Sequence, residues 1–379
     1  MSEFQLYQFK SLDRPLTEAE RKEIGSWSSR TRPTANSATF TYSYGDFPKD
    51  EEQVVERYFD AMLYASNWGS KRLMFRLPKN LTDVDALAKY TFENDWSENY
   101  ISLKQCSECY LLDIHFNHEE GGGWLEEDDY ALDDFASLRE DILNGDYRSL
   151  YLAWLQFAQN ATAAEDEDDE EGMDALMPPP VPANLAKMTG ALQAFVDFFD
   201  VDQDIVAAAK SASPKNDAPP MDYPQLIGQL PNNEPTEWLL RLANDEPRLA
   251  LEFKKRLQGL VPTQKQRPVA QLSLAEIKAL TAVKEKERLE QEAEAARLAH
   301  IQKMKQFALD ETTLWKSVDF NLSKATGSSY DQATQTLKDL RDLAVYQGKE
   351  SAFRTKMAAI REQYVRRHAL IKRFDGAGL

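Results

Sequence analysis

The stretch TFTYSYGDFPKDEEQVVERYFDAMLYASNWGSKRLMFRL, residues 39–77, decides the fold class that the sequence predicts. At its start, aromatic and small polar residues alternate with the period of two that a half-buried strand shows. The aromatic face of that strand consists of Phe40, Tyr42 and Tyr44. From Asp50 to Ala65, apolar residues recur at steps of three and four instead. This spacing predicts an amphipathic helix, and acidic residues in its first turns complement the helix dipole.

A second strand follows this helix after the turn residues Asn67, Trp68 and Gly69. Its alternating residues are expected to place three apolar side chains inward, Leu73, Phe75 and Leu77. The side chains expected to point outward are Arg72, Met74 and Arg76. Pro78 cannot continue a hydrogen-bonded ladder, so the strand should end there. Strand, helix and strand together predict a βαβ unit.

Further strands extend this unit into a domain. Alternating apolar residues predict strands near residues 4–9, 100–105 and 109–117, with helices between and after them. We therefore expect residues 1–160 to form an α+β domain with a mixed sheet of about four or five strands.

The composition changes abruptly after residue 160. Residues 161–183 contain an acidic run followed by several prolines, which is typical of a flexible linker. Residues 184–260 predict a small helical domain. Residues 261–379 predict a long helix followed by a C-terminal helical hairpin. That long helix should run from Ser273 to about Leu309, with a mostly solvated middle.

Charge and composition restrict the class of protein. The 379 residues carry a formal net charge of −18, although residues 261–379 are basic on balance. An acidic body argues against nucleic-acid binding through the overall field. No apolar run approaches the roughly 18 residues of a membrane span, and the polar start lacks a secretory signal. Two cysteines cannot form a disulfide framework, which agrees with a reducing compartment. We therefore expect a cytoplasmic protein that does not contact a membrane.

Both cysteines lie close to two of the four histidines, in the set Cys106, Cys109, His115 and His118. Two thiolates and two imidazoles can satisfy tetrahedral zinc. On a strand, however, His115 and His118 would point to opposite faces, and Cys109 would share a face with His115 only. The alternative is that all four are ordinary strand residues. We expect this alternative and predict no metal and no cofactor.

Two basic clusters are candidate binding sites. The first should gather on the outer face of the sheet, where it would bind phosphate or an acidic peptide and use Trp68 for stacking. Its residues are Arg30, Arg32, Trp68, Arg72 and Arg76. The alternative is an ordinary solvated face, or one that the acidic linker of the same chain covers.

The second basic cluster lies in the C-terminal helices and is a candidate nucleic-acid site. Its residues are Arg354, Lys356, Arg361, Arg366, Arg367, Lys372 and Arg373. Cations near helix C-termini also complement the helix dipole, so the alternative is a stabilising role within the helices.

Short segments near both ends resemble a family of bacterial proteins. They are YQFK (7–10), LDRPLT (12–17), GDF (45–47), NWG (67–69), DLRDLA (339–344) and YVRR (364–367). This resemblance implies no activity, cofactor or catalytic residue. The C-terminal hairpin is also similar to one in bacterial SWIM-type zinc-finger proteins, but the zinc ligands of that finger are absent from the sequence.

The sequence contains no Gly-x-Ser-x-Gly, His-Glu-x-x-His or Gly-x-Gly-x-x-Gly motif. It therefore predicts neither hydrolase nor metalloprotease nor dinucleotide chemistry. We expect a non-enzymatic protein–protein interaction or scaffold subunit of a bacterial multi-protein system. One alternative is a nucleic-acid-associated protein that binds through the C-terminal helices. A second alternative is an enzyme whose active site is assembled from residues distant in sequence.

Overall fold

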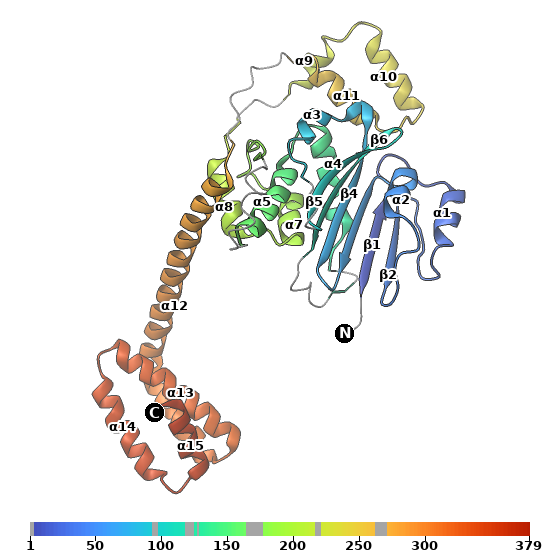
Figure 1. The fold of residues 1–379 in the computed structure, drawn as a ribbon. Helices are drawn as coiled ribbons and strands as arrows, with labels where there is room; N and C mark the ends of the chain where they lie inside the picture. Colours follow the sequence, from blue (N-terminus) through green and yellow to red (C-terminus); the bar gives the residue numbers. More distant parts are fainter. Residues whose placement is uncertain are drawn as a thin grey trace, which may run out of the picture. The chain divides into compact units, whose positions relative to one another are not determined.

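The computed structural model describes residues 4–92, 98–117, 125–126, 129–163, 177–216, 221–261 and 271–379. The chain divides into two units, Met1–Glu285 and Lys286–Leu379. The first unit holds a β-sheet with helices on both of its faces, and the second unit is helical (Figure 1). The predicted fold class, an α+β region followed by an all-helical region with a long helix, is confirmed.

The sheet has six strands in the order β2-β1-β3-β4-β6-β5. The strands are β1 (Gln5–Lys10), β2 (Ser37–Tyr42), β3 (Ala61–Ser66), β4 (Ser70–Pro78), β5 (Tyr100–Gln105) and β6 (Cys109–Asn117). Each neighbouring pair runs antiparallel. The sheet is therefore larger than the predicted four or five strands, and it is antiparallel rather than mixed.

The βαβ unit expected over residues 39–77 is replaced by a strand, a short helix and a hairpin. Helix α2 (Glu51–Tyr58) is capped by Asp50 and ends at Phe59, whose backbone is extended. Met62 and Ala65, expected on that helix, lie on β3 instead. Because β3 is central and buried on both faces, its continuous apolar run matches a helical period as well as a strand. Gly69, with φ of +104°, then closes the tight turn to β4, so these strands must be antiparallel.

The two faces of the sheet carry separate cores. Four helices cover one face, namely α4 (Ala136–Leu143), α5 (Arg148–Ala163), α7 (Gly190–Phe198) and α8 (Gln203–Ala212). Their apolar residues pack against Leu73, Phe75 and Ile114 of the sheet. Helices α1 (Glu18–Gly25) and α2 lie over the other face, which presents Met62 and Met74. Thr17 begins α1 with the capping box that the sequence predicts.

Shorter helices complete the first unit. They are η1 (Lys79–Leu81), α3 (Val84–Leu87), η2 (Leu132–Asp134), α9 (Tyr223–Ile227), α10 (Glu234–Ala243) and α11 (Leu249–Gln258). Helices α7 and α8 share the core of the sheet, so the sequence-based boundaries at residues 184 and 260 do not coincide with the division at residue 285. Of the expected linker, residues 164–176 lie outside the described part, whereas Val181 is buried in the sheet core.

The long helix α12 (Leu274–Lys324) extends about four turns beyond the predicted end near Leu309. Helices α13 (Gly327–Tyr346), α14 (Glu350–Gln363) and α15 (His368–Ala377) follow it. In the second unit, these three helices and the end of α12 pack around Leu322, Leu337 and Phe374. Within the part of the chain that the structure describes, no helix has the length and apolarity to cross a membrane.

A candidate binding pocket on the sheet

A row of aromatic and ionisable side chains crosses five strands on the α2 side of the sheet. Tyr7 of β1 pairs with Tyr64 of β3, and Tyr64 pairs with Arg72 of β4. Arg72 pairs with His115 of β6, which in turn pairs with Tyr100 of β5. Directly opposed residues on neighbouring antiparallel strands have their Cβ atoms about 4.5–5.5 Å apart. Register alone therefore places these five side chains next to one another.

These five side chains line a pocket of about 350 Å³. Three other residues complete its lining, namely Glu51 at the start of α2, Met62 of β3 and Glu98 before β5. Ser, Thr, Cys and Lys, which are common nucleophiles, do not occur among these eight described lining residues. The polar groups of the lining are instead two carboxylates, one imidazole, three phenols and one guanidinium.

Arg72 is held in place by a buried carboxylate. Its Nε donates to Asp113 Oδ1 at 2.8 Å, and its Nη2 donates to Asp113 Oδ2 at 2.6 Å. Glu51 and Glu52 lie farther from its guanidinium nitrogens, at 3.8 and 3.9 Å. Burial disfavours the charged guanidinium, but the bonds to Asp113 outweigh that effect, so the pKa of Arg72 is raised. The positive charge of Arg72 is therefore neutralised within the pocket wall.

His115 presents a hydrogen-bond acceptor to the pocket. Its Nδ1 lies 2.6 Å from the carbonyl oxygen of Glu98, and because a carbonyl only accepts, Nδ1 carries the proton. Burial lowers the pKa of His115, so the ring is neutral at pH 7 and Nε2 keeps its lone pair. Tyr100 packs against the imidazole with ring centroids 5.3 Å apart, and its hydroxyl donates to Asp113 Oδ2 at 3.1 Å.

The other end of the row is fixed by Gln5. The hydroxyl groups of Tyr7 and Tyr64 donate to Gln5 Oε1 at 2.7 and 3.3 Å, and the two rings lie 4.6 Å apart. Burial raises the pKa values of Tyr7, Tyr64 and Tyr100, so all three phenols stay protonated at neutral pH. The Tyr rings therefore offer neutral aromatic surfaces.

The charges around this pocket favour a cation. Four carboxylates, those of Glu51, Glu52, Glu98 and Asp113, lie at or beside this pocket with two cations, Arg72 and the Lys104 that pairs with Glu52, which leaves a net charge of about −2. Aromatic faces attract cations, and the neutral His115 ring accepts a hydrogen bond. The arrangement therefore suits a ligand group that is positively charged and rich in N–H donors.

The structure does not bring the first predicted basic cluster together. Of its five residues, only Arg72 lines the pocket. Arg30 and Arg32 are exposed in the connection between α1 and β2, and Trp68 is 39% exposed in the β3–β4 turn. Arg72 and Arg76 were expected on an open outer face, but the α1 and α2 layer covers that face of the sheet. Both arginines are therefore held in ion pairs instead.

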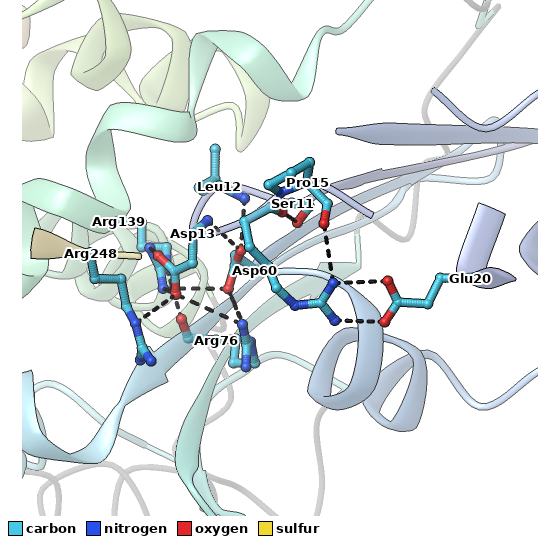
Figure 2. A network of polar contacts seen from close by, with 10 residues as sticks. Ser11, Leu12, Asp13, Pro15, Glu20, Asp60, Arg76, Arg139 and Arg248 are labelled. Atoms are coloured by element: carbon cyan, nitrogen blue, oxygen red, sulfur yellow. Dashed lines mark hydrogen bonds and ion pairs between the residues drawn. The ribbon is translucent and has the colours of Figure 1, made fainter. Parts of the chain in front are cut away.

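Arg76 belongs to a network of five charged side chains from distant parts of the chain (Figure 2). Asp60 Oδ1 accepts from Arg76 Nε at 3.0 Å and lies 3.5 Å from Arg139 Nη2. Arg139 also donates to both carboxylate oxygens of Asp13, each at 2.9 Å. The Nε atom of Arg248, which precedes α11, lies 3.7 Å from Asp13 Oδ2. The network joins β4, the start of β3, the β1–α1 connection, α4 and α11.

Of the four candidate zinc ligands, the three that the structure describes do not all meet. Cys106 lies in the β5–β6 turn and Cys109 begins β6, whereas His115 is six residues farther along that strand than Cys109, about 20 Å away in an extended chain. His118 lies outside the described residues. Glu56 of α2 takes the place of the histidines beside the two thiols. No local pattern could have indicated Glu56, because fifty residues separate it from Cys106.

The predicted nucleic-acid cluster is mostly engaged within the second unit. Five of its seven residues contact neighbours there: Arg354 with Glu350, Lys356 with the ring of Trp315, Arg361 with Asp375, Arg367 with Leu322 and Arg373 with Asp331. Arg366 and Lys372 are exposed. Nucleic-acid binding by this cluster stays a prediction.

The pocket row was not predicted as a unit, although Arg72 and His115 were each singled out. The alternation of each strand indicates which residues share a face, but only the pairing register shows which residues are neighbours. No family model matches the chain, and no curated protein or solved structure is significantly similar to it. The resemblances drawn from short segments of the sequence therefore stay expectations.

Proposed function

We propose that this protein is a non-enzymatic interaction subunit that receives a basic side chain of a partner protein in the sheet pocket. The observation that carries this proposal is the cross-strand row, which combines three neutral phenol rings, a neutral imidazole and an excess of carboxylates. A Lys ammonium or an Arg guanidinium matches these features, because it is a cation that donates several hydrogen bonds.

Helix α10 favours a protein ligand over a free small cation. Its leucines Leu239, Leu240 and Leu242 are all at least 60% exposed. Adjacent exposed leucines on one helix are unusual on a soluble surface and mark protein interaction sites. The pocket would supply specificity for a basic side chain, and apolar contacts of this kind would supply affinity.

The proposal is tested with the full-length protein as bait in native extract treated with nuclease. The variant that removes pocket function is Glu51→Gln combined with His115→Leu. Glu18→Gln is the matched control, because it removes one exposed carboxylate from α1 outside the pocket lining. We expect a protein that the wild type and Glu18→Gln retain and that the pocket variant loses.

A peptide titration then tests the ligand class directly. Two peptides that differ only in a central Lys or Glu are added, and the methyl resonance of Met62, which lines the pocket, is followed by NMR. The Lys peptide should shift this resonance in the wild type and in Glu18→Gln, and the shift should be lost with Glu51→Gln. Equal shifts for both peptides, or partners that disappear after nuclease treatment, would contradict the proposal. Turnover of nucleotides, nucleic acids or esters that the pocket variant abolishes would also overturn it.

A further inference from the structure

The turn between β5 and β6 brings two thiols together at the edge of the α2 layer. Its sequence is Cys106-Ser107-Glu108-Cys109, and the N–H of Cys106 donates to the carbonyl oxygen of Cys109 at 2.9 Å. Cys109 is buried, and Cys106 packs partly buried against the same apolar cluster as α2. The backbone bond fixes the separation of the two residues, so the thiols are held as a pair.

Glu56 of α2 adds a third donor to this pair. The Cys106 and Cys109 sulfur atoms and one Glu56 carboxylate oxygen all lie within 4.8 Å of one another. The N–H of Ser107 donates to Glu56 Oε1 at 3.3 Å, which orients the carboxylate toward the turn. One turn earlier on α2, Glu52 forms an ion pair with Lys104 of β5. The helix is thus attached to the hairpin at Lys104 and at Ser107, next to the three donors.

This donor set and its spacing suit a zinc ion. Zinc binds thiolates at about 2.3 Å and carboxylate oxygens at about 2.0–2.2 Å, with tetrahedral geometry. Two sulfurs of one tetrahedron are then about 3.8 Å apart. Since the three donor atoms already lie within 4.8 Å of one another, side-chain shifts of about 1 Å would complete the site. Two thiolates and one carboxylate around Zn²⁺ leave a net charge of −1. Burial raises the pKa of both thiols, that of Cys109 to about 12, whereas the charges of Arg76 and Lys104 act in the opposite direction on Cys109 and Cys106, respectively.

We propose that Cys106, Cys109 and Glu56 form a zinc site in which water occupies the fourth position. Binding displaces the two thiol protons, which are released to solvent. The bound ion joins the end of α2 to the β5–β6 turn across 50 residues of chain. This site does not depend on the proposed pocket function.

The experiment uses the reduced, full-length protein after removal of metal by a chelator. Cobalt, which takes the coordination geometry of zinc, is titrated first and is then displaced with zinc. We expect one cobalt ion per chain with a thiolate-to-cobalt charge-transfer band, loss of that band on zinc addition, and a higher Tm for the zinc-loaded protein. Cys106→Ser and Cys109→Ser should each weaken the charge-transfer band and lower the affinity for cobalt at least tenfold.

Controls separate this site from adventitious binding. Glu56→Gln should keep the charge-transfer band but lose at least tenfold in affinity, whereas Glu52→Gln should bind as the wild type does. His115→Leu should also bind normally, because His115 lies far along β6. Comparable circular dichroism without metal shows that each variant is folded. The proposal is overturned if the reduced wild type binds no stoichiometric cobalt or zinc, or if a variant lacking both cysteines binds as tightly.

Discussion

The buried ion network makes a strong prediction about Asp60. Its carboxylate is 1% exposed and accepts the backbone N–H groups of Leu12 and Asp13 at 2.7 and 2.8 Å through Oδ2. Its Oδ1 accepts two bonds from Arg76 (Figure 2). In Asp60→Asn, the NH₂ of the new amide must face either the two backbone N–H groups or the Arg76 guanidinium. In addition, Arg76 and Arg139 each lose a buried counter-charge.

The expected loss follows from these contacts. Removing one partner of a buried ion pair destabilises by about 3–5 kcal/mol, which is a large part of the roughly 5–15 kcal/mol that holds a domain folded. We expect Asp60→Asn to lose about 4 kcal/mol, which shifts the urea midpoint by about 1.3 M for an m value of about 3 kcal/mol/M. Tryptophan fluorescence follows the right unit, because six of the seven tryptophans precede residue 286.

The matched control is Glu20→Gln, and Glu20 is labelled in the same view (Figure 2). Glu20 also bonds an arginine, Arg14, at 2.6 Å, but these two side chains are 20% and 41% exposed, and Gln can keep the capping-box bond to Thr17. Exposed pairs contribute little, so this variant should lose about 1 kcal/mol or less. A loss below about 1 kcal/mol for Asp60→Asn, equal to that of the control, would refute the reasoning.

The pH dependence gives an independent check. Burial would raise the pKa of Asp60, but Arg139, Arg76 and the two backbone N–H groups outweigh burial, so the pKa is lowered. A carboxyl with a depressed folded pKa stabilises fully above its unfolded pKa of about 3.9. That contribution is lost as the pH falls through the folded pKa. The difference between wild type and Asp60→Asn should therefore be constant from about pH 5 to 8 and should shrink below about pH 4.

Two further predictions concern residues that the sequence singled out. Arg367→Ala should destabilise the second unit by about 2 kcal/mol, because the Arg367 side chain donates to the carbonyl of Leu322 at 2.6 Å, whereas neighbouring Arg366→Ala should change the urea midpoint little. Equal effects of the two substitutions would contradict the assigned contact. For His115, burial lowers the folded pKa, so its neutral form stabilises fully above the unfolded pKa of about 6.5, and this contribution is lost as the pH falls through the folded pKa. An NMR titration of the His115 ring should give a midpoint below about 6.5, and a midpoint above that value would refute the burial argument.

Local patterns predicted the elements that depend on local chemistry. The capping box of Thr17 and Glu20 begins α1 as expected, and the alternating residues of β5 and β6 form strands. Strand β3 was missed because it is buried on both faces, and a continuous apolar run fits a helix equally well. Because β3 was assigned to a helix, the sequence predicted a βαβ unit with parallel strands. In the structure, a hairpin at Gly69 joins β3 directly to β4, so these two strands are antiparallel.

The candidate sites depend on pairings that no local pattern contains. Arg72 and His115 are neighbours because β4 and β6 pair in one register, and a shift by one residue would place them on opposite faces. The engagement of Arg76 requires Asp60, Asp13 and Arg139 to converge from separate elements. Sequence alone therefore indicated which residues were chemically notable but not which of them would meet.

Helix α2 connects the two proposals without making them dependent on each other. Its acidic residues were expected only to complement the helix dipole, yet Glu51 in the first turn lines the pocket and Glu56 in the second turn lies beside the two thiols. Five residues of helix separate these side chains by about 7.5 Å along the axis, so they act at different places on the sheet. Glu51→Gln should therefore lose the Lys peptide and keep zinc, while Glu56→Gln should weaken zinc and leave the pocket residues in place. If both substitutions abolished both kinds of binding, the common cause would be displacement of α2, and neither carboxylate would be a direct ligand contact.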